Sequence, residues 1–279
     1  MYRLFNNIAA VLLSVLFVSC SSRPLPPTVL KPEDFPLSKG QSITVDVNSG
    51  VLNVTQAANQ DAAISGTISN SQVVDFKTTL EADGLHIVSK TTGNSFFQGT
   101  VPPIQINLQA PVGIPIIVNT FDANVKIHDY SGAAMINSVA GDLLAQHVSG
   151  QLSLYSNRGD STVENSSGEF NLLGNYGLLS ILDSHGTVSA STIIGTIRFL
   201  GTVEAGDYLK LETDHASIDI QLGQDSDALV QVTSTSGVVD CSMAGILYEG
   251  ERCTGTLQGG QGKLQVRTVS GNVTLQPLP

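Results

Sequence analysis

Four polar residues recur at intervals of eighteen in this chain: Asp129, His147, Asn165 and Asp183. If the chain passes the same point every eighteen residues, their side chains stack along one edge, about 4.8 Å apart. Carboxylates and a histidine at that spacing could hold a metal ion, bind a sugar or exchange protons with a substrate. Aspartate and asparagine are also favoured at tight turns for backbone reasons alone. We therefore treat the four as a candidate ligand-binding ladder, and expect no catalytic residue, no metal and no cofactor.

The elements that must position this ladder are set by a glycine at every ninth residue. The positions two and four residues after each glycine are apolar almost throughout, with Ser161 as the exception, and the residues between them are mostly polar. Such alternation predicts short strands that bury one side and are joined by glycine turns. The repeat glycines are Gly132, Gly141, Gly150, Gly159, Gly168, Gly177, Gly186 and Gly195, with Ala123 in the same place one period earlier.

The residue before each glycine indicates that two nine-residue units make one coil. Serine stands there in alternate units, at Ser131, Ser149 and Ser167, whereas the units between have other residues such as Arg158 and Tyr176. The sequence therefore predicts an all-β fold, a single-stranded parallel β-solenoid (β-helix) of about 18 residues per coil. Its N-terminal portion is expected to be β-structured but less regular.

The first residues predict export and a lipid anchor. Residues 1–19 contain one basic residue, Arg3, and an apolar run over residues 8–18 that is too short to span a bilayer, which is typical of a signal peptide. Cys20 follows at the expected cut and resembles the lipid-modified cysteine of bacterial lipoproteins, with an outer-membrane or cell-surface location implied. Simple cleavage near Ser19 with release is the alternative.

The rest of the chain divides by composition. Residues 20–40 carry several prolines without apolar periodicity and are expected to be a lipid-anchor site and extended tether. Residues 41–279 are expected to form one adhesin-like β-solenoid domain. Within it, residues 41–115 are less regular, residues 116–200 contain the strict nine-residue repeats, and residues 201–279 contain irregular repeats.

The charge of the chain excludes one class of partner. Removal of residues 1–19 takes away Arg3, which leaves 12 basic and 24 acidic side chains and a formal net charge of −12. An acidic chain without a basic patch is a poor ligand for nucleic acid, so no nucleic-acid partner is expected. Attachment to a membrane would have to come from the lipid.

Cys241 and Cys253 are the cysteines that remain after Cys20, and they are predicted to form a disulfide in an oxidising compartment. A metal site or free thiols are the alternatives, although no histidine lies nearby to complete a zinc site. The last apolar strands, around Leu264 and Leu275, are followed by a short stretch that contains Pro277 and Pro279. That C-terminal edge is therefore expected to be either blocked or used for self-association.

Three further motifs are weak candidates. Arg158-Gly159-Asp160 spells an integrin-recognition tripeptide, but the glycine is already explained by the repeat. Tyr176 could lie near Arg158 and form part of a binding strip, although a scattered surface tyrosine is commoner. Repeat-bound calcium is rejected because the units lack paired glycines and a regular aspartate, which leaves Asp225 and Asp227 as a weak single site.

Recurring turn-and-strand phrases resemble a known bacterial family. Examples are Val148-Ser149-Gly150-Gln151-Leu152, Thr235-Ser236-Gly237-Val238-Val239 and Val269-Ser270-Gly271-Asn272-Val273. They are similar to the "putative adhesin" family of uncharacterised, often lipid-anchored β-solenoid domains. The resemblance implies a cell-surface or periplasmic binding or structural role toward an envelope protein or polysaccharide, and it supplies no catalytic residues to carry over.

A polysaccharide lyase or hydrolase is the rival interpretation, because β-helices also host such enzymes. These enzymes need concentrated charge and rings that stack on sugars. This chain has no tryptophan, 5% aromatic residues and 13% charged residues. The sequence therefore favours a non-catalytic module.

Overall fold

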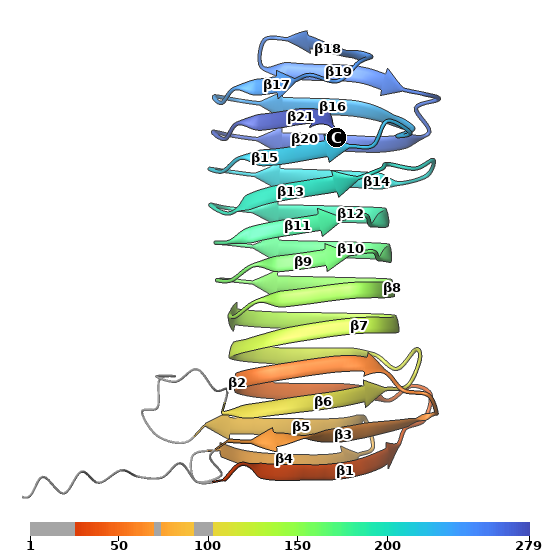
Figure 1. Cartoon of the computed structure of the whole chain (residues 1–279), viewed down its shortest axis with the longest axis vertical. Helices are drawn as coiled ribbons and strands as arrows, with labels where there is room; N and C mark the ends of the chain where they lie inside the picture. The colour runs from red at the N-terminus through yellow and green to blue at the C-terminus, as the bar shows by residue number, and fades with distance from the viewer. Residues whose placement is uncertain (1–25, 70–73, 92–102) are drawn as a thin grey trace, which may run out of the picture.

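The computed structural model describes residues 26–69, 74–91 and 103–279, so the predicted signal peptide and Cys20 lie outside the described residues. Within them, 21 strands form one continuous sheet that winds around a single core, and there is no helix (Figure 1). Accordingly, the described part of the chain has no helix long and apolar enough to cross a membrane. The predicted all-β character is confirmed.

The strands follow one another closely along the chain. Their bounds are β1 (Thr28–Pro36), β2 (Ser42–Gln56), β3 (Asp61–Ile68), β4 (Val74–Glu81), β5 (Gly84–Thr91), β6 (Ile104–Ala110), β7 (Ile116–Ala140), β8 (Leu143–Ser156), β9 (Ser161–Glu164), β10 (Ser167–Gly174), β11 (Leu178–Leu182), β12 (His185–Thr192), β13 (Thr196–Gly201), β14 (Tyr208–Thr213), β15 (Ile218–Leu222), β16 (Ala228–Ser234), β17 (Val239–Cys241), β18 (Ile246–Glu249), β19 (Arg252–Leu257), β20 (Gly262–Thr268) and β21 (Val273–Pro277).

The sheet has two faces that meet at two edges. Face A stacks β1, β3, β6, β9, β11, β13, β15, β21 and β17 in that order, and face B stacks β4, β5, β10, β12, β14, β20, β16, β19 and β18. The long strands β2, β7 and β8 run around an edge and contribute to both faces. The result is the tall column of Figure 1.

The middle of the column pairs in parallel with the eighteen-residue offset expected from the repeat. Gly150 lies opposite both Gly132 and Gly168, and Gly168 lies opposite Gly186. Each coil therefore consists of one strand on each face. Past β13 the offset becomes larger, since Ile197 pairs with Ile218.

The predicted core positions are all buried. Both inward series, from Val125 and Ile127 to Ile197 and Phe199, are at most 5% exposed. Ser161, the one polar residue among them, is also buried, and its hydroxyl has no hydrogen-bond partner among the described residues. Each series alternates between the two faces, and packing of the inward side chains of face A against those of face B provides the main stabilisation of the column.

The repeat glycines are required by the close stacking of successive coils. A Cβ atom on Gly168 would lie 2.0 Å from the carbonyl oxygen of Gly150, and one on Gly159 would lie 2.2 Å from that of Gly141. Both glycines also have positive φ angles, 144° and 118°. Any side chain at these positions would therefore push two coils apart.

The sheet as a whole is mixed, so the prediction of a single-stranded parallel β-solenoid is wrong. At the N-terminal end β1–β3, β3–β6 and β4–β5 pair antiparallel, and at the other end β16–β19 and β18–β19 do so. Parallel coiling alone leaves the last coil with an open core and an unpaired edge. Antiparallel hairpins fold the chain back across both ends.

The predicted tether over residues 20–40 is also wrong from Thr28 onward. Residues 28–36 form β1, which pairs with β3 and buries Phe35. The pairing shifts register between Leu30 and Glu33, where Pro32 stands. An end strand tolerates proline because one side of its backbone needs no partner, so the prolines do not prevent a strand here.

The C-terminal strands are not at an edge, which corrects the predicted site of self-association. β20 is paired on both sides, with β14 and β16, and β21 lies between β15 and β17. Strands β16 to β19 come earlier in the sequence and form the cap above them (Figure 1). An open C-terminal edge is therefore unavailable for pairing with a second copy.

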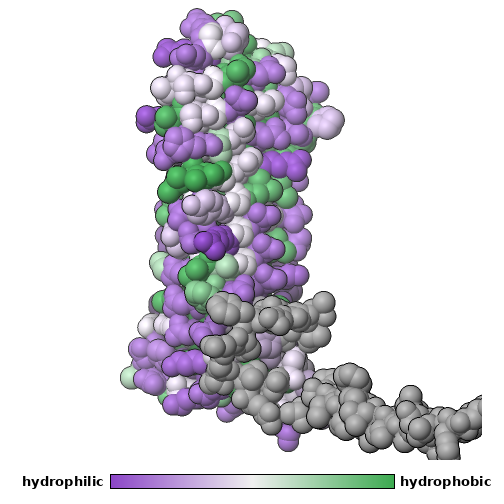
Figure 2. Space-filling model, turned by 90° about the vertical axis from the view of Figure 1, so that its left-hand side faces the viewer, coloured by the Kyte–Doolittle hydropathy of each residue, from purple (hydrophilic) through white to green (hydrophobic). Residues whose placement is uncertain are grey.

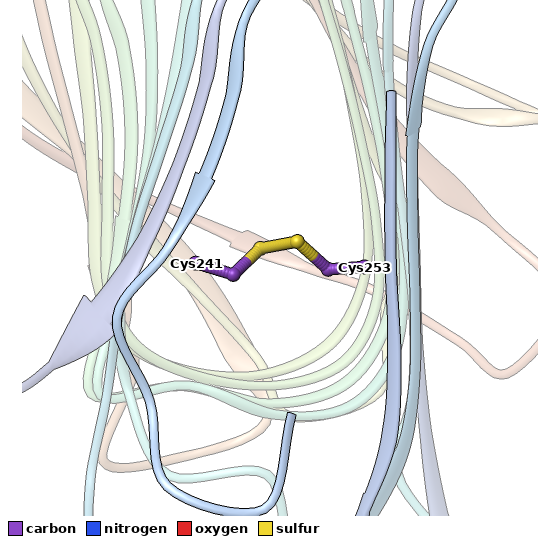
Figure 3. Close-up of a disulfide and its surroundings, with 2 residues drawn as sticks. All are labelled: Cys241 and Cys253. Carbon is purple, nitrogen blue, oxygen red and sulfur yellow. A yellow bond between two sulfur atoms is a disulfide. The ribbon is translucent and has the colours of Figure 1, made fainter. Parts of the chain in front are cut away.

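A disulfide joins Cys241 of β17 to Cys253 of β19, which confirms the predicted pairing. It links face A to face B across the inside of the column (Figure 3). A crosslink that closes a loop of this length stabilises a fold by about 3 kcal/mol on the chain-entropy model. The disulfide therefore fastens the capped end.

Candidate functional site

The predicted ladder occupies one edge of the column, here called the aspartate edge. Its residues Asp129, His147, Asn165 and Asp183 occupy equivalent corner positions and have φ angles of 51°, 52°, 48° and 42°. Asparagine and aspartate are the residues that enter this left-handed region most readily after glycine. The interpretation of the ladder as turn chemistry accounts for these backbone angles.

The ladder residues do not assemble into a catalytic group. Asp129 and Asp183 are three coils apart, roughly 14 Å at the usual strand spacing. The paired carboxylates of glycosidases lie at most about 9.5 Å apart. Asn165 bonds to its neighbour Glu164 at 3.4 Å and does not connect the two aspartates.

The carboxylate of Asp129 is held between two histidines. His128 Nδ1 lies 3.1 Å from one of its oxygens and His147 Nδ1 lies 3.1 Å from the other. The hydrogen bond to His128, followed by the weaker effect of His147, lowers the pKa of Asp129. All three side chains are exposed, so water competes with this arrangement.

Arg158-Gly159-Asp160 is part of the turn structure. The carboxylate of Asp160 accepts a hydrogen bond from the backbone N–H of Leu178 at 2.8 Å. The backbone N–H of Asp160 donates to Asp142 Oδ1 at 3.0 Å. The backbone N–H of Asp142 in turn donates to Asn124 Oδ1. One coil is thus fastened to the next by a column of side chains, and Asp160 is engaged in it.

Metal-capable side chains come together at one place among the described residues. Glu81, Asp83 and His86, in the β4–β5 hairpin, have ligand atoms within 4.8 Å of one another. His86 Nε2 is already hydrogen-bonded to Asp83 at 3.0 Å, and this bond lowers the pKa of Asp83. The weak calcium candidate Asp225 and Asp227 does not form such a group, and Asp227 accepts the backbone N–H of Gln261.

A groove of about 380 Å³ lies at the opposite edge, here called the apolar edge. Its lining comes from four stacked segments: residues 46–48 of β2, 119–121 and 137–139 of β7, and Tyr155 of β8. The pairing register places Asp46 opposite Asn119 and Asn137 opposite Tyr155. The groove therefore runs along the column across successive coils.

Hydrogen bonds organise the polar side of the groove. Asn137 Nδ2 donates to Asn119 Oδ1 at 3.0 Å, and Asn119 Nδ2 donates to Asp46 Oδ1 at 2.8 Å. Among the described residues, neither Asp46 Oδ2 nor Asn137 Oδ1 accepts a hydrogen bond. The groove thus presents acceptors and amide N–H groups that are held in fixed directions.

Exposed apolar side chains form the other side of the groove and continue above it along the apolar edge. Figure 2 looks onto this edge and shows hydrophobic side chains in separate groups along its height, with hydrophilic side chains between them. Phe121 is 58% exposed and Tyr155 is 41% exposed. The apolar strip, as we call the set, consists of Phe121, Val139, Tyr155, Leu173, Tyr176, Ile193 and Ile194.

The sequence interpretation found only one member of this strip, Tyr176, as a weak candidate. The remaining members stand at outward strand positions or at turns, which the repeat leaves free to vary. A signal was present, because Phe121 and Val139 are eighteen residues apart, as are Tyr155 and Leu173. Large apolar residues at equivalent surface positions of successive coils indicate a surface strip.

Several solved bacterial structures are similar to this chain at low sequence identity. No protein-family model matches the chain, and no curated protein matches it. A solved putative adhesin from Bacteroides fragilis is 12% identical, with 89% of this chain and 97% of that one covered and a TM-score of 0.38. A putative lipid binding protein from Parabacteroides distasonis is also 12% identical, with 91% and 97% covered and a TM-score of 0.36.

A third solved structure, a putative cell adhesion protein from Clostridium sporogenes, is 12% identical. Its alignment covers 89% of this chain and 100% of that one, with a TM-score of 0.32. Likeness at this level does not carry a function from one chain to another. The function proposed below rests on the residues of this chain.

Proposed function

We propose that this protein is a non-catalytic, adhesin-like binding module of the bacterial cell envelope, anchored by lipid at Cys20. The apolar strip carries the proposal. Large exposed apolar side chains that gather along one edge of successive coils mark a surface that a partner can cover, even where hydrophilic side chains separate the groups. The partner in this proposal is another envelope or surface component, a protein or a polysaccharide.

The position of the strip supports this function. The described chain begins beside β1, at one end of the column, whereas the strip begins with Phe121 and extends toward the other end (Figure 1). An anchor preceding β1 would hold that end near the membrane. The strip would then stand clear of the bilayer and be accessible to a partner.

A non-catalytic role is supported by the arrangement of the ionisable residues. The strongest acid–base candidates, Asp129 and Asp183, are too far apart to act on one bond. Among the residues that line the groove on the apolar edge, Asp46 carries the one carboxylate, and the only other ionisable group is the phenol of Tyr155. No observation favours the alternative of a polysaccharide lyase or hydrolase.

An adhesion assay tests the binding role. Beads coated with the full-length protein are exposed to envelope fragments of the bacterium that produces it, and the retained material is quantified. We expect the double variant Ile193→Ser/Ile194→Ser to retain about fivefold less material than the unmodified protein. Val112→Ser, a comparably exposed residue beside the aspartate edge, is the matched control and should retain the same amount. Equal retention by all three proteins would overturn the proposal.

The lipid anchor is tested separately. Replacement Cys20→Ala should move the protein from the membrane fraction to the soluble fraction and abolish labelling by a radioactive fatty acid. Unchanged fractionation and labelling would show that Cys20 is not the anchor. Conservation of the melting temperature in the variant would establish that the column itself is intact.

A further inference from the structure

We propose that the groove on the apolar edge binds a segment of a neutral glycan chain. This inference rests on the proposed function, since it names the ligand class for one part of the binding surface. The groove combines exposed aromatic rings with a fixed row of amide and carboxylate groups. A chain of uncharged sugar rings complements both features.

The polar row suits a ligand that carries hydroxyl groups. Asp46, Asn119 and Asn137 hold one another in place by hydrogen bonds of 2.8 and 3.0 Å. Among the described residues, Asp46 Oδ2 and Asn137 Oδ1 remain open as acceptors, and each amide retains a second N–H. A sugar hydroxyl donates one hydrogen bond and accepts others, so one ring can use both kinds of group. Because the row is already ordered, little side-chain entropy is lost on binding.

The aromatic rings suit the faces of sugar rings. Phe121 and Tyr155 stand on coils two levels apart, about 10 Å along the column axis. This separation is comparable to the length of two pyranose rings in an extended chain. The apolar C–H face of a sugar ring can cover an exposed aromatic side chain, which removes apolar surface from water.

The charge of the protein and the backbone pairing of its strands disfavour two other classes of ligand, acidic glycans and peptides. The chain carries a formal net charge of −11, and the one carboxylate among the residues that line the groove is that of Asp46, which disfavours an acidic glycan. The strands that form the groove are paired to neighbours on both sides. A peptide therefore has no free strand edge there to extend, which is the commonest way for a β-sheet to hold a peptide.

Binding assays on the full-length protein in mild detergent test this inference. The probes are neutral cello-, manno- and chito-oligosaccharides, acidic alginate and hyaluronate oligosaccharides, and a pool of extended peptides. We expect at least one neutral probe to bind measurably by calorimetry and the acidic probes not to bind. Phe121→Ala and Tyr155→Ala should each weaken the binding about tenfold, and Asn137→Ala several-fold.

Matched variants separate the groove from general surface effects. Tyr248→Ala removes an aromatic ring of similar exposure, 57%, from the cap. Asn107→Ala removes one partner of the Asn53–Asn107 amide pair, which lies outside the groove. Both variants should bind the neutral probe as the unmodified protein does.

Each contrary outcome has a definite meaning. Absence of neutral-glycan binding, binding only of acidic glycans or peptides, or equal binding by Phe121→Ala and the unmodified protein would overturn the inference. If envelope fragments are still retained through Ile193 and Ile194 in that case, the proposed function stands without a glycan ligand. If the unmodified protein retains no fragments, the proposed function fails, whatever the oligosaccharides show.

Discussion

The aspartate edge and the apolar edge turn the chain with the same period but use different chemistry. At the aspartate edge, non-glycine residues such as Asn165 adopt left-handed backbone angles, and serine hydroxyls such as that of Ser166 accept backbone N–H groups from the neighbouring coil. At the apolar edge, the carboxylates of Asp142 and Asp160 accept the backbone N–H groups of the neighbouring coil. Within the residues that the structure describes, the apolar edge also carries a row of large exposed apolar side chains, and the aspartate edge does not.

This difference separates structural residues from residues available for binding. On the aspartate edge the notable side chains are explained by the turn itself, since a corner with a positive φ angle favours aspartate, asparagine and histidine. On the apolar edge the turn is satisfied by backbone-bonded side chains, and Phe121, Tyr176 and Ile194 have no evident part in it. A turn can be conspicuous in the sequence and still offer no binding site. The less regular outward positions beside the turn can offer one.

The largest expected effect on stability comes from replacing a repeat glycine, and it is expected at both edges. Gly168→Ala at the aspartate edge and Gly159→Ala at the apolar edge should each lower the free energy of unfolding by about 3 kcal/mol or more, because the new methyl group meets a carbonyl oxygen of the next coil. Urea denaturation measures the loss. Gly113→Ala, where the φ angle is positive but no atom lies within 4 Å, should lose only about 1 kcal/mol. If one repeat glycine proved as tolerant as Gly113, the coils at that edge would not be in close contact.

A smaller effect is expected at Tyr130, which lies beside Asp129 and packs inside the column. Its hydroxyl donates to the carbonyl of Ile114, and burial raises its pKa to about 12. Tyr130→Phe should lower the free energy of unfolding by about 1–2 kcal/mol because the carbonyl loses its partner. Tyr155→Phe at the apolar edge should leave the free energy of unfolding unchanged.

The direction of the pKa shift of Tyr130 sets the alkaline limit of its contribution. Because its pKa is higher in the folded state than the ordinary value near 10, its contribution is complete below about pH 10 and is lost as pH rises toward about 12. Absorbance of tyrosinate should show one group titrating after the others. Its persistence in Tyr130→Phe would assign the late titration to another tyrosine.

Replacing one aspartate at each edge should have different effects on stability. Asp160→Ala removes the acceptor of the Leu178 N–H and should cost about 1 kcal/mol. Asp183→Gly places at a φ angle of 42° the residue that adopts it without strain, and should be neutral or stabilising by a few tenths of a kcal/mol. Melting temperatures of the two variants, measured together, test the contrast. A comparable loss in both would mean that the Asp183 side chain makes a stabilising contact of its own.

The smallest effect concerns the titration of Asp129. Its pKa is lowered mainly by the hydrogen bond to His128, so His128→Gln should raise it toward the ordinary value more than His147→Gln does. A lowered carboxyl pKa stabilises the fold above the unfolded-state value, and this contribution is lost as pH falls through the folded-state value. Carbon-detected NMR titration measures each shift. A larger response to His147→Gln would reverse the assignment.

The sequence predicted those parts of the fold in which one coil repeats the last. Glycines such as Gly150 and Gly168 must recur because a side chain there would separate the coils, so the register could be inferred from spacing. The ends were mispredicted because caps interrupt the repeat. The prolines around Pro32 resemble a tether, although an end strand can accommodate them, and strand pairing between distant segments has no local signal.

The candidate site was predicted less well than the fold. The ladder at Asp129 and His147 was located correctly, because turn residues recur with the glycines. The groove depends on side chains from four levels, and identical residues recur there at the eighteen-residue interval only as Asn119 and Asn137, although the apolar Phe121 and Val139 also stand eighteen residues apart. Outward positions need no particular residue type for folding, so their pattern emerges only after the register is known.

The insertion of β20 and β21 beneath the cap affects how the fold can be completed during synthesis. Strands β14 to β19 leave the ribosome first, yet the level between β15 and β17 is filled only when residues 262–277 arrive. The column therefore cannot be assembled strictly from one end as the polypeptide emerges. Until its last strands are delivered, a gap persists beneath the cap, and a polypeptide stalled short of them would expose this unfinished level to proteases and chaperones.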